Sequence, residues 1–165
     1  MLITDGTRVL LLADTDPGIP GSRWWTTPGG GLEPPETPRQ AAVRELAEET
    51  GQHVAPDALA GPLAVREVVH GYSDQILVQR ETFFAWRTST FDVDESGRTD
   101  DERLTLTATA WIRLDALAGL PDPVWPDNLA WMLALAANPP EGPVDLGRVE
   151  ESTVPEQPQP SRMMR

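Results

Sequence analysis

Residues 29–51 read GGGLEPPETPRQAAVRELAEETG, a glycine-rich loop that leads into the most clearly marked helix of the chain. Thr37 suits the N-cap position, and Gln40 stands at the spacing of a capping box. Gly51 suits the C-terminal cap, where a left-handed backbone conformation is common. Together these signals predict a helix over residues 38–50.

Three carboxylates share one face of this predicted helix. Glu45, Glu48 and Glu49 project within an arc of about 100°. Like charges at this spacing destabilise a helix by about 0.2–0.5 kcal/mol per pair, and the C-terminal end of a helix disfavours anions further. One interpretation is a solvated acidic face. The other is a divalent cation site, because Mg²⁺ takes a few carboxylates together with water and phosphate oxygens.

The loop before the helix carries three consecutive glycines. Gly29, Gly30 and Gly31 follow a predicted short strand at residues 23–27 and let the backbone approach a phosphate closely. A simple tight turn explains the same glycines equally well. The loop is neither a P-loop nor a dinucleotide fingerprint, because it lacks both Gly-Lys-Ser/Thr and Gly-x-Gly-x-x-Gly.

Taken together, this stretch resembles the Nudix box, G-x(5)-E-x(7)-R-E-U-x-E-E-x-G-U, in which U is a bulky aliphatic residue. The matching residues are Gly30, Glu36, Arg44, Glu45, Leu46, Glu48, Glu49 and Gly51. Gln52 departs from the pattern at the final aliphatic position but removes no catalytic group. The resemblance extends to Trp24–Gly31 and to residues 110–117, and it covers roughly residues 1–137.

The resemblance implies an α/β (α+β) fold, an αβα sandwich around a mixed central sheet. The sequence pattern agrees, because predicted strands alternate with two helices. Strands are expected at 8–13, 23–27, 63–70, 75–86 and 109–114, a helical turn at 115–118, a helix capped by Asp127 at 127–137, and an acidic loop at 91–103.

The resemblance also implies an activity, the hydrolysis of a diphosphate bond in a nucleoside diphosphate linked to another moiety, by water attack on phosphorus. Mg²⁺ or Mn²⁺ would be held by Glu45, Glu48 and Glu49. Arg44 is expected to orient a box carboxylate, and Glu36 to brace the loop. The general base is either a box glutamate or Glu102, which otherwise is a solvated loop acid.

Substrate contacts are expected from Gly29, Gly30 and Gly31 and from aromatic side chains. One residue of the pair Trp24 and Trp25 is expected in the core, and we assign Trp25 to the substrate, together with Tyr72. Core packing and an ordinary turn aromatic are the alternatives for these two. Glu81 faces the cleft or forms a cross-strand ion pair.

Composition limits the partners. The 165 residues include 26 acidic side chains and 13 basic ones, all Arg, for a formal charge of −13. This balance disfavours duplex nucleic acid, whose binding relies on clustered Lys and Arg. No Cys is present, and no apolar run near the N-terminus is long enough for a membrane anchor, so we expect a cytoplasmic protein acting on a small nucleotide diphosphate substrate.

The chain divides into a predicted catalytic domain, residues 1–138, and a proline-rich tail, residues 139–165, expected to be disordered or loosely docked. The resemblance admits a homodimer. The alternative function is a catalytically silent Nudix-fold module that binds a nucleotide, although the intact glutamate set argues against it. An isoprenoid diphosphate isomerase is disfavoured by the absence of Cys. The sequence does not identify the particular diphosphate substrate, and it leaves open whether the native N-terminus starts upstream of Met1.

Overall fold

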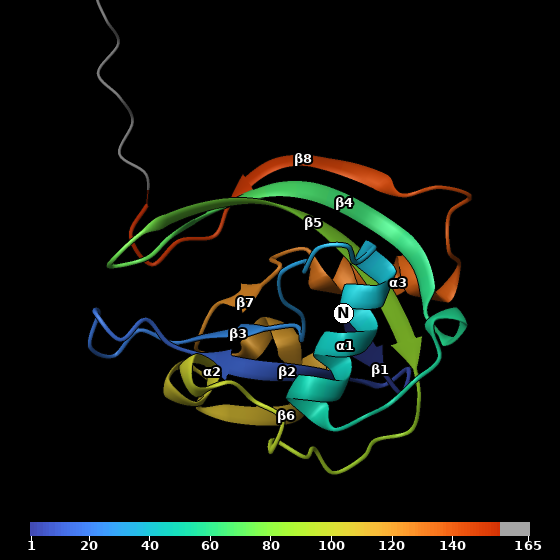
Figure 1. Cartoon of the computed structure of the whole chain (residues 1–165), viewed down its shortest axis with the longest axis horizontal. Helices are drawn as coiled ribbons and strands as arrows, with labels where there is room; N and C mark the ends of the chain where they lie inside the picture. The colour runs from blue at the N-terminus through green and yellow to red at the C-terminus, as the bar shows by residue number, and fades with distance from the viewer. Residues whose placement is uncertain (156–165) are drawn as a thin grey trace, which may run out of the picture.

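The computed structural model describes residues 1–155, in which eight strands form one curled, mixed sheet (Figure 1). The strands are β1 Leu2–Thr4, β2 Arg8–Asp14, β3 Trp24–Thr26, β4 Ala60–Gly71, β5 Ile76–Arg87, β6 Ala108–Arg113, β7 Val124–Trp125 and β8 Val144–Glu150. Their order is β7-β3-β2-β1-β5-β4-β8, and β6 pairs with β2. The helices are α1 Pro38–Thr50, α2 Asp100–Thr105 and α3 Leu129–Ala137, with 3₁₀ turns at Pro56–Ala58 and Leu114–Gly119.

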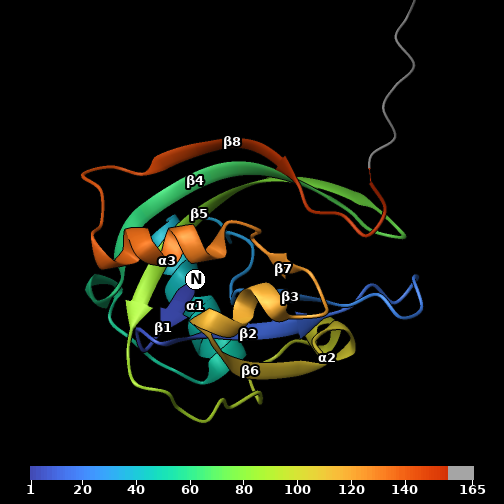
Figure 2. The same cartoon turned by 180° about the vertical axis from the view of Figure 1, so that it is seen from behind.

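Helices cover both faces of the sheet. Successive apolar side chains along its central strands point to opposite faces, so each face has a core to bury. Leu11 packs in the cluster that contains Met132 of α3. Its neighbour Leu10 packs in the cluster that contains Leu46 of α1. Figure 2 shows α3 in front of the sheet and α1 behind it. Each fully buried leucine contributes about 1.5–3 kcal/mol. The predicted sandwich around a mixed sheet is confirmed.

Helix α1 has the predicted bounds, residues 38–50, and the predicted caps. The Thr37 hydroxyl accepts a hydrogen bond from the Gln40 backbone N–H at 3.3 Å, and the Gln40 side chain accepts one from the Thr37 backbone N–H at 2.8 Å. Gly51 follows with φ 72°, the left-handed conformation that its missing side chain allows. The capping residues therefore fix where the three helix carboxylates stand.

The two longest strands, β4 and β5, form the predicted hairpin. They pair antiparallel, with Arg66 opposite Glu81 and Gly71 opposite Ile76. Both strands curve over one side of the molecule in Figure 1, and residues of both line the cavity described below. The hairpin thus supplies one wall of the site.

Two predicted segments have the wrong boundaries. Residues 100–103, expected as the end of the acidic loop at 91–103, belong to α2, because Thr99 and Glu102 make a second capping box. Helix α3 begins at Leu129 rather than 127, with Asn128 at the N-cap position. The backbone N–H of Asp127 instead donates to Oε1 of Glu151 at 3.3 Å.

The prediction of a disordered tail is corrected for residues 144–150, which form β8 and pair parallel with β4. The strand occupies an edge of β4 whose N–H and C=O groups otherwise need partners. The sequence did not indicate this strand because Gly147 interrupts its alternation of apolar and polar residues. In the structure Gly147 has φ 71°. Residues 156–165 of the predicted tail lie outside the described residues.

Within residues 1–155, no helix combines the length and the apolar character that crossing a membrane requires.

Candidate active site

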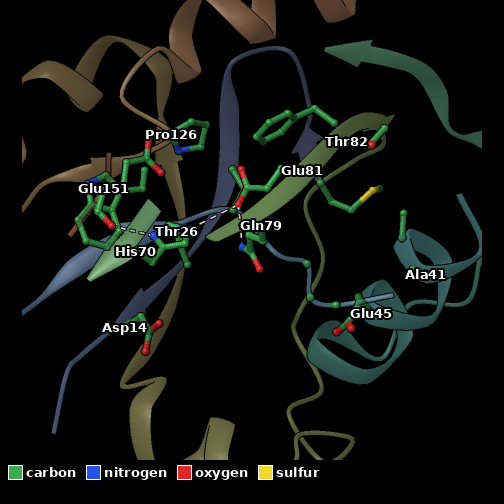
Figure 3. A pocket seen from close by; sticks show the side chains of 18 of the residues that line it. Asp14, Thr26, Ala41, Glu45, His70, Gln79, Glu81, Thr82, Pro126 and Glu151 are labelled. Atoms are coloured by element: carbon green, nitrogen blue, oxygen red, sulfur yellow. Dashed lines mark hydrogen bonds and ion pairs between the residues drawn. The ribbon is translucent and has the colours of Figure 1, made fainter. Parts of the chain in front are cut away.

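A cavity of about 510 Å³ lies between α1, the β4–β5 hairpin and α2. Its lining includes Glu45 from α1 and, across from it, His70 and Asp14. Figure 3 shows Glu45 on one side of this space, His70 and Asp14 on the other, and Gln79 and Glu81 between them. The cavity therefore has a carboxylate end and a second end of different chemistry.

The carboxylate end brings together Glu45 and Glu49 of α1 and Glu102 of α2. One oxygen from each residue lies within 4.8 Å of the others. Glu45 and Glu49 are one helical turn apart and are 6% and 4% exposed. Helix α2, which the sequence prediction missed, carries Glu102 to them from the far end of the 91–103 segment. Three carboxylates from two elements thus converge.

Glu49 is held by the glycine loop. The backbone N–H of Gly29 donates to Oε2 of Glu49 at 2.7 Å. Burial raises the pKa of Glu49 to about 8; the Gly29 hydrogen bond lowers it, while the nearby charges of Glu45 and Glu102 raise it. A positive charge that joins the cluster would therefore favour the ionised form of this carboxylate.

Arg44 ties the loop to the helix. Its Nε donates to Oε1 of Glu36 at 2.9 Å, and its Nη2 donates to the Gly31 carbonyl at 2.8 Å. Its Nη1 donates to Glu45 Oε1 and to Glu48 Oε2, both at 2.8 Å. The expected bracing role of Glu36 is confirmed by these contacts.

Glu48 is the predicted ligand that does not join the cluster. Its side chain is 38% exposed and faces Arg44. Glu45 shares the same guanidinium but points inward, and burial is the main cause that raises its pKa, opposed by Arg44. The three predicted box ligands therefore divide, with Glu45 and Glu49 inside and Glu48 at the edge.

The three glycines all line the cavity, as expected for substrate contacts. Gly30 has a specific reason to lack a side chain, since a Cβ there would collide with the Glu45 carboxylate. At Gly31, no atom lies within 4 Å of the position a Cβ would take. Gly30 therefore leaves the room in which Glu45 faces the cavity.

The other end of the cavity is aromatic. Trp24 lies 6.2 Å from Tyr72 and 4.8 Å from Trp125, measured between ring centroids, and His70 lies 5.8 Å from Tyr72. All four line the cavity. Burial raises the pKa of Tyr72 to about 12, so its phenol is neutral. Tyr72 is thus placed where its predicted role requires.

The structure corrects the assignment of Trp25 to the substrate. Trp25 packs in the core cluster with Leu11, and Arg23 lies over its ring at 5.1 Å. Neighbouring residues on a strand point to opposite faces, so only one of the pair can face the cavity. That residue is Trp24.

Sequence reasoning missed a buried group of charged residues behind the aromatic end. Arg66 of β4 contacts Glu81 of β5 and Glu151, which follows β8. The cross-strand alternative for Glu81 is thus confirmed, and Glu81 lines the cavity as well. No sequence pattern indicated a buried role for Glu151, because it lies in the proline-rich stretch 139–165, for which no packed structure was predicted.

The carboxylate end fits a divalent metal. Its donors are hard oxygens, the class that Mg²⁺ and Mn²⁺ prefer, and they come from three residues that leave room for water and substrate. Burial, together with the charges of Glu45 and Glu102, raises the pKa of Glu49, and a bound cation would offset both effects. The residues present therefore suit the ion that the box resemblance implies.

Comparison with known proteins agrees with this geometry. The model of the NUDIX domain matches residues 1–135. A putative 8-oxo-dGTP diphosphatase from Bacillus subtilis (strain 168) is 34% identical over 61 residues, which are 37% of this chain; the chain spans 38% of that relative's length.

Two solved structures share the fold. An Ap4A hydrolase from C. elegans, solved as a binary complex, is 20% identical, with a TM-score of 0.53 over 81% of this chain and 90% of that one. A NUDIX hydrolase from Nitrosomonas europaea is 21% identical, with a TM-score of 0.56 over 81% and 82% of the two chains. With a family model that matches most of its length, the chain belongs to the Nudix family.

Proposed function

We propose that this protein is a metal-dependent pyrophosphohydrolase that cleaves the diphosphate bond of a nucleoside diphosphate linked to another moiety, by water attack on phosphorus. The observation that carries the proposal is the convergence of Glu45, Glu49 and Glu102 within 4.8 Å at one end of a cavity whose other end is aromatic. A charged phosphate chain binds through a cation held by carboxylates, whereas a planar organic group packs against aromatic rings. The two ends of the cavity provide these two environments separately.

Glu45 and Glu49 would hold Mg²⁺ or Mn²⁺, with Glu48 as the third box carboxylate at the exposed edge and Glu102 facing them from α2. When bound, the ion neutralises phosphate charge and lowers the pKa of a water. Arg44 holds Glu45 and Glu48 in place, and Gly29 orients Glu49. These contacts give the carboxylates one fixed arrangement before substrate arrives.

Glu102 is our choice of general base. Its Oε2 accepts hydrogen bonds from the backbone N–H and the hydroxyl of Thr99, at 2.7 and 2.9 Å. These bonds fix the side chain while leaving Oε1 to take a proton from the attacking water. A box glutamate, Glu45, is the alternative base in the same cluster.

Gly29, Gly30 and Gly31 are proposed to contact the phosphates, and Trp24 and Tyr72 the organic group. The names of the diphosphatase from Bacillus subtilis and of the Ap4A hydrolase from C. elegans support a nucleotide as the substrate class. The net charge of −13 supports a small substrate held through a cation rather than duplex nucleic acid. A cytoplasmic location and a homodimer stay predictions.

The test is product release from a panel of nucleotide sugars, dinucleoside polyphosphates and nucleoside triphosphates, with Mg²⁺ or Mn²⁺. We expect turnover of at least one class, its loss in Glu49→Gln, and wild-type turnover in Glu141→Gln, which removes an exposed carboxylate outside the cavity lining. The proposal fails if nothing turns over and Glu49→Gln binds Mn²⁺ as tightly as the wild type.

A further inference from the structure

A chain of polar contacts runs along the cavity wall opposite the carboxylate cluster. Glu151 accepts two hydrogen bonds from Arg66, at 2.7 and 2.5 Å. The Nε of Arg66 donates to Oε2 of Glu81 at 2.6 Å. The side-chain amide of Gln79 then donates to Oε1 of Glu81 at 3.2 Å. A residue beyond the family match at 1–135 is thereby connected to the cavity.

Glu151 is fixed by its backbone as well as by its side chain. Its N–H donates to the Val69 carbonyl at 2.9 Å, and its carbonyl lies 2.7 Å from Nδ1 of His70. Glu151 and Arg66 are 5% and 4% exposed. A buried bidentate pair of this kind holds both side chains in one geometry. Glu151 therefore sets where Arg66 can donate.

Glu81 is held as an anion. Burial would raise its pKa, but His70, whose Nε2 lies 3.7 Å from Oε1, and the charge and hydrogen bond of Arg66 lower the pKa of Glu81 to about 2. An ionised carboxylate can only accept hydrogen bonds. Gln79 must therefore turn its NH₂ toward Glu81 and its Oε1 away from it.

The free side of Gln79 faces the cavity. In Figure 3 the Gln79 oxygen points away from Glu81 into the space between Glu81 and Glu45. None of residues 1–155 donates a hydrogen bond to this oxygen. An oriented acceptor beside an aromatic end is suited to a substrate group that carries an N–H donor.

We propose that Gln79 determines specificity by accepting a hydrogen bond from the exocyclic amino group of a nucleobase, and that Glu151 is the positioning residue that orients it through Arg66 and Glu81. This inference rests on the proposed nucleotide-binding cavity and names the substrate feature it selects. Substrates whose base has an exocyclic amino group are preferred over analogues without one.

The test measures binding, so that it does not depend on turnover. Dissociation constants are measured by titration calorimetry with Ca²⁺ for two pairs, GDP with IDP and ADP with purine riboside diphosphate. The second member of each pair lacks one amino group. We expect the wild type to prefer the amino-bearing member of at least one pair by about tenfold, as for one unpaired buried hydrogen bond. In Gln79→Leu, the preference falls to about one.

A double-mutant cycle separates positioning from general structure. Glu151→Gln should lower the preference, and adding it to Gln79→Leu should change the preference no further. The control is Glu67→Gln, which breaks a 2.7 Å ion pair with Arg148 between the same two strands at the exposed surface. This control should retain the wild-type preference. If Glu151→Gln does not fold, Glu81→Gln replaces it, because an amide at 81 no longer dictates the orientation of Gln79.

Equal binding within both pairs by the wild type overturns the inference, as does a wild-type preference in Gln79→Leu or additive effects in the cycle. The turnover panel decides the proposed hydrolysis separately. A protein that hydrolyses nucleotides but shows no preference contradicts this inference alone.

Discussion

The backbone N–H of Gly29 donates a 2.7 Å hydrogen bond to Oε2 of Glu49, joining the glycine-rich loop to the inner face of α1. This single donor only partly offsets the burial of Glu49, whose exposed fraction is 4%. The charge on Glu49 is therefore the quantity that pH and metal should both control.

We expect the metal-free protein to lose stability as the pH rises. The pKa of Glu49 is raised from 4.5 to about 8, so the folded state holds this proton more tightly than the unfolded state. Its stabilising effect is complete below about pH 4.5 and is lost as the pH rises toward 8, by up to about 4 kcal/mol. Urea unfolding in EDTA from pH 5 to 8 measures the slope.

The same pH series on Glu49→Gln should give a flatter profile, and saturating Mg²⁺ should flatten that of the wild type. Glu141→Gln serves as the charge-matched control. Parallel profiles for wild type and Glu49→Gln would show that Glu49 is ionised in the metal-free fold and that its burial has no such consequence.

Gly30→Ala should weaken the affinity of the carboxylate cluster for a divalent cation. The added Cβ would collide with the Glu45 carboxylate and push it from the cluster. We expect at least a tenfold weaker affinity for Mn²⁺, corresponding to about 1.4 kcal/mol. Metal affinity is measured by titration calorimetry. Gly119→Ala, where no atom lies within 4 Å of the new Cβ, is the control; similar affinities in the two variants would contradict the crowding argument.

Glu102→Gln should lower kcat by about 10²–10⁴-fold if Glu102 takes the proton from water. Asp101→Asn removes a neighbouring exposed charge of the same helical turn and should leave kcat unchanged. Steady-state kinetics with the best panel substrate provides the measurement. A Glu102→Gln variant with wild-type kcat would transfer the role to Glu45.

Asp16→Asn should destabilise the fold by about 1–3 kcal/mol, because Asp16 is a buried acceptor shared by distant segments. Its Oδ2 accepts from the backbone N–H of Ser73 at 2.7 Å and from the Thr153 hydroxyl at 2.6 Å. Thermal unfolding reports the change. Asp74→Asn, an exposed change in the same turn as Ser73, should be neutral; an equal loss there would trace the effect to net charge.

Local signals predicted the parts of the fold that local chemistry determines. The caps at Thr37 and Gly51 marked both ends of α1, and the spacing of Glu45 and Glu49 placed them on one face. The box residues carried the family resemblance, which the domain match confirms. Thr99 and Glu102 show the same kind of capping signal at α2, but the acidic surroundings concealed it.

What the sequence could not predict depends on contacts between distant segments. Glu48 pairs with Arg44 one helical turn away, a local contact, but which helix carboxylates face the cavity depends on how α1 packs on the sheet. The choice between Trp24 and Trp25 rests on which face of β3 meets the core. Glu151 meets Arg66 only because β8 pairs with β4, 85 residues away along the chain.

The position of Glu151 behind Arg66 separates two tasks within one cavity. The clustered carboxylates lie on α1 and α2, whereas the wall with Arg66 and Glu81 is braced by Glu151, which follows the last strand. Mutations at Glu151 should therefore alter which nucleobase is accepted without moving a carboxylate of the cluster formed by Glu45, Glu49 and Glu102.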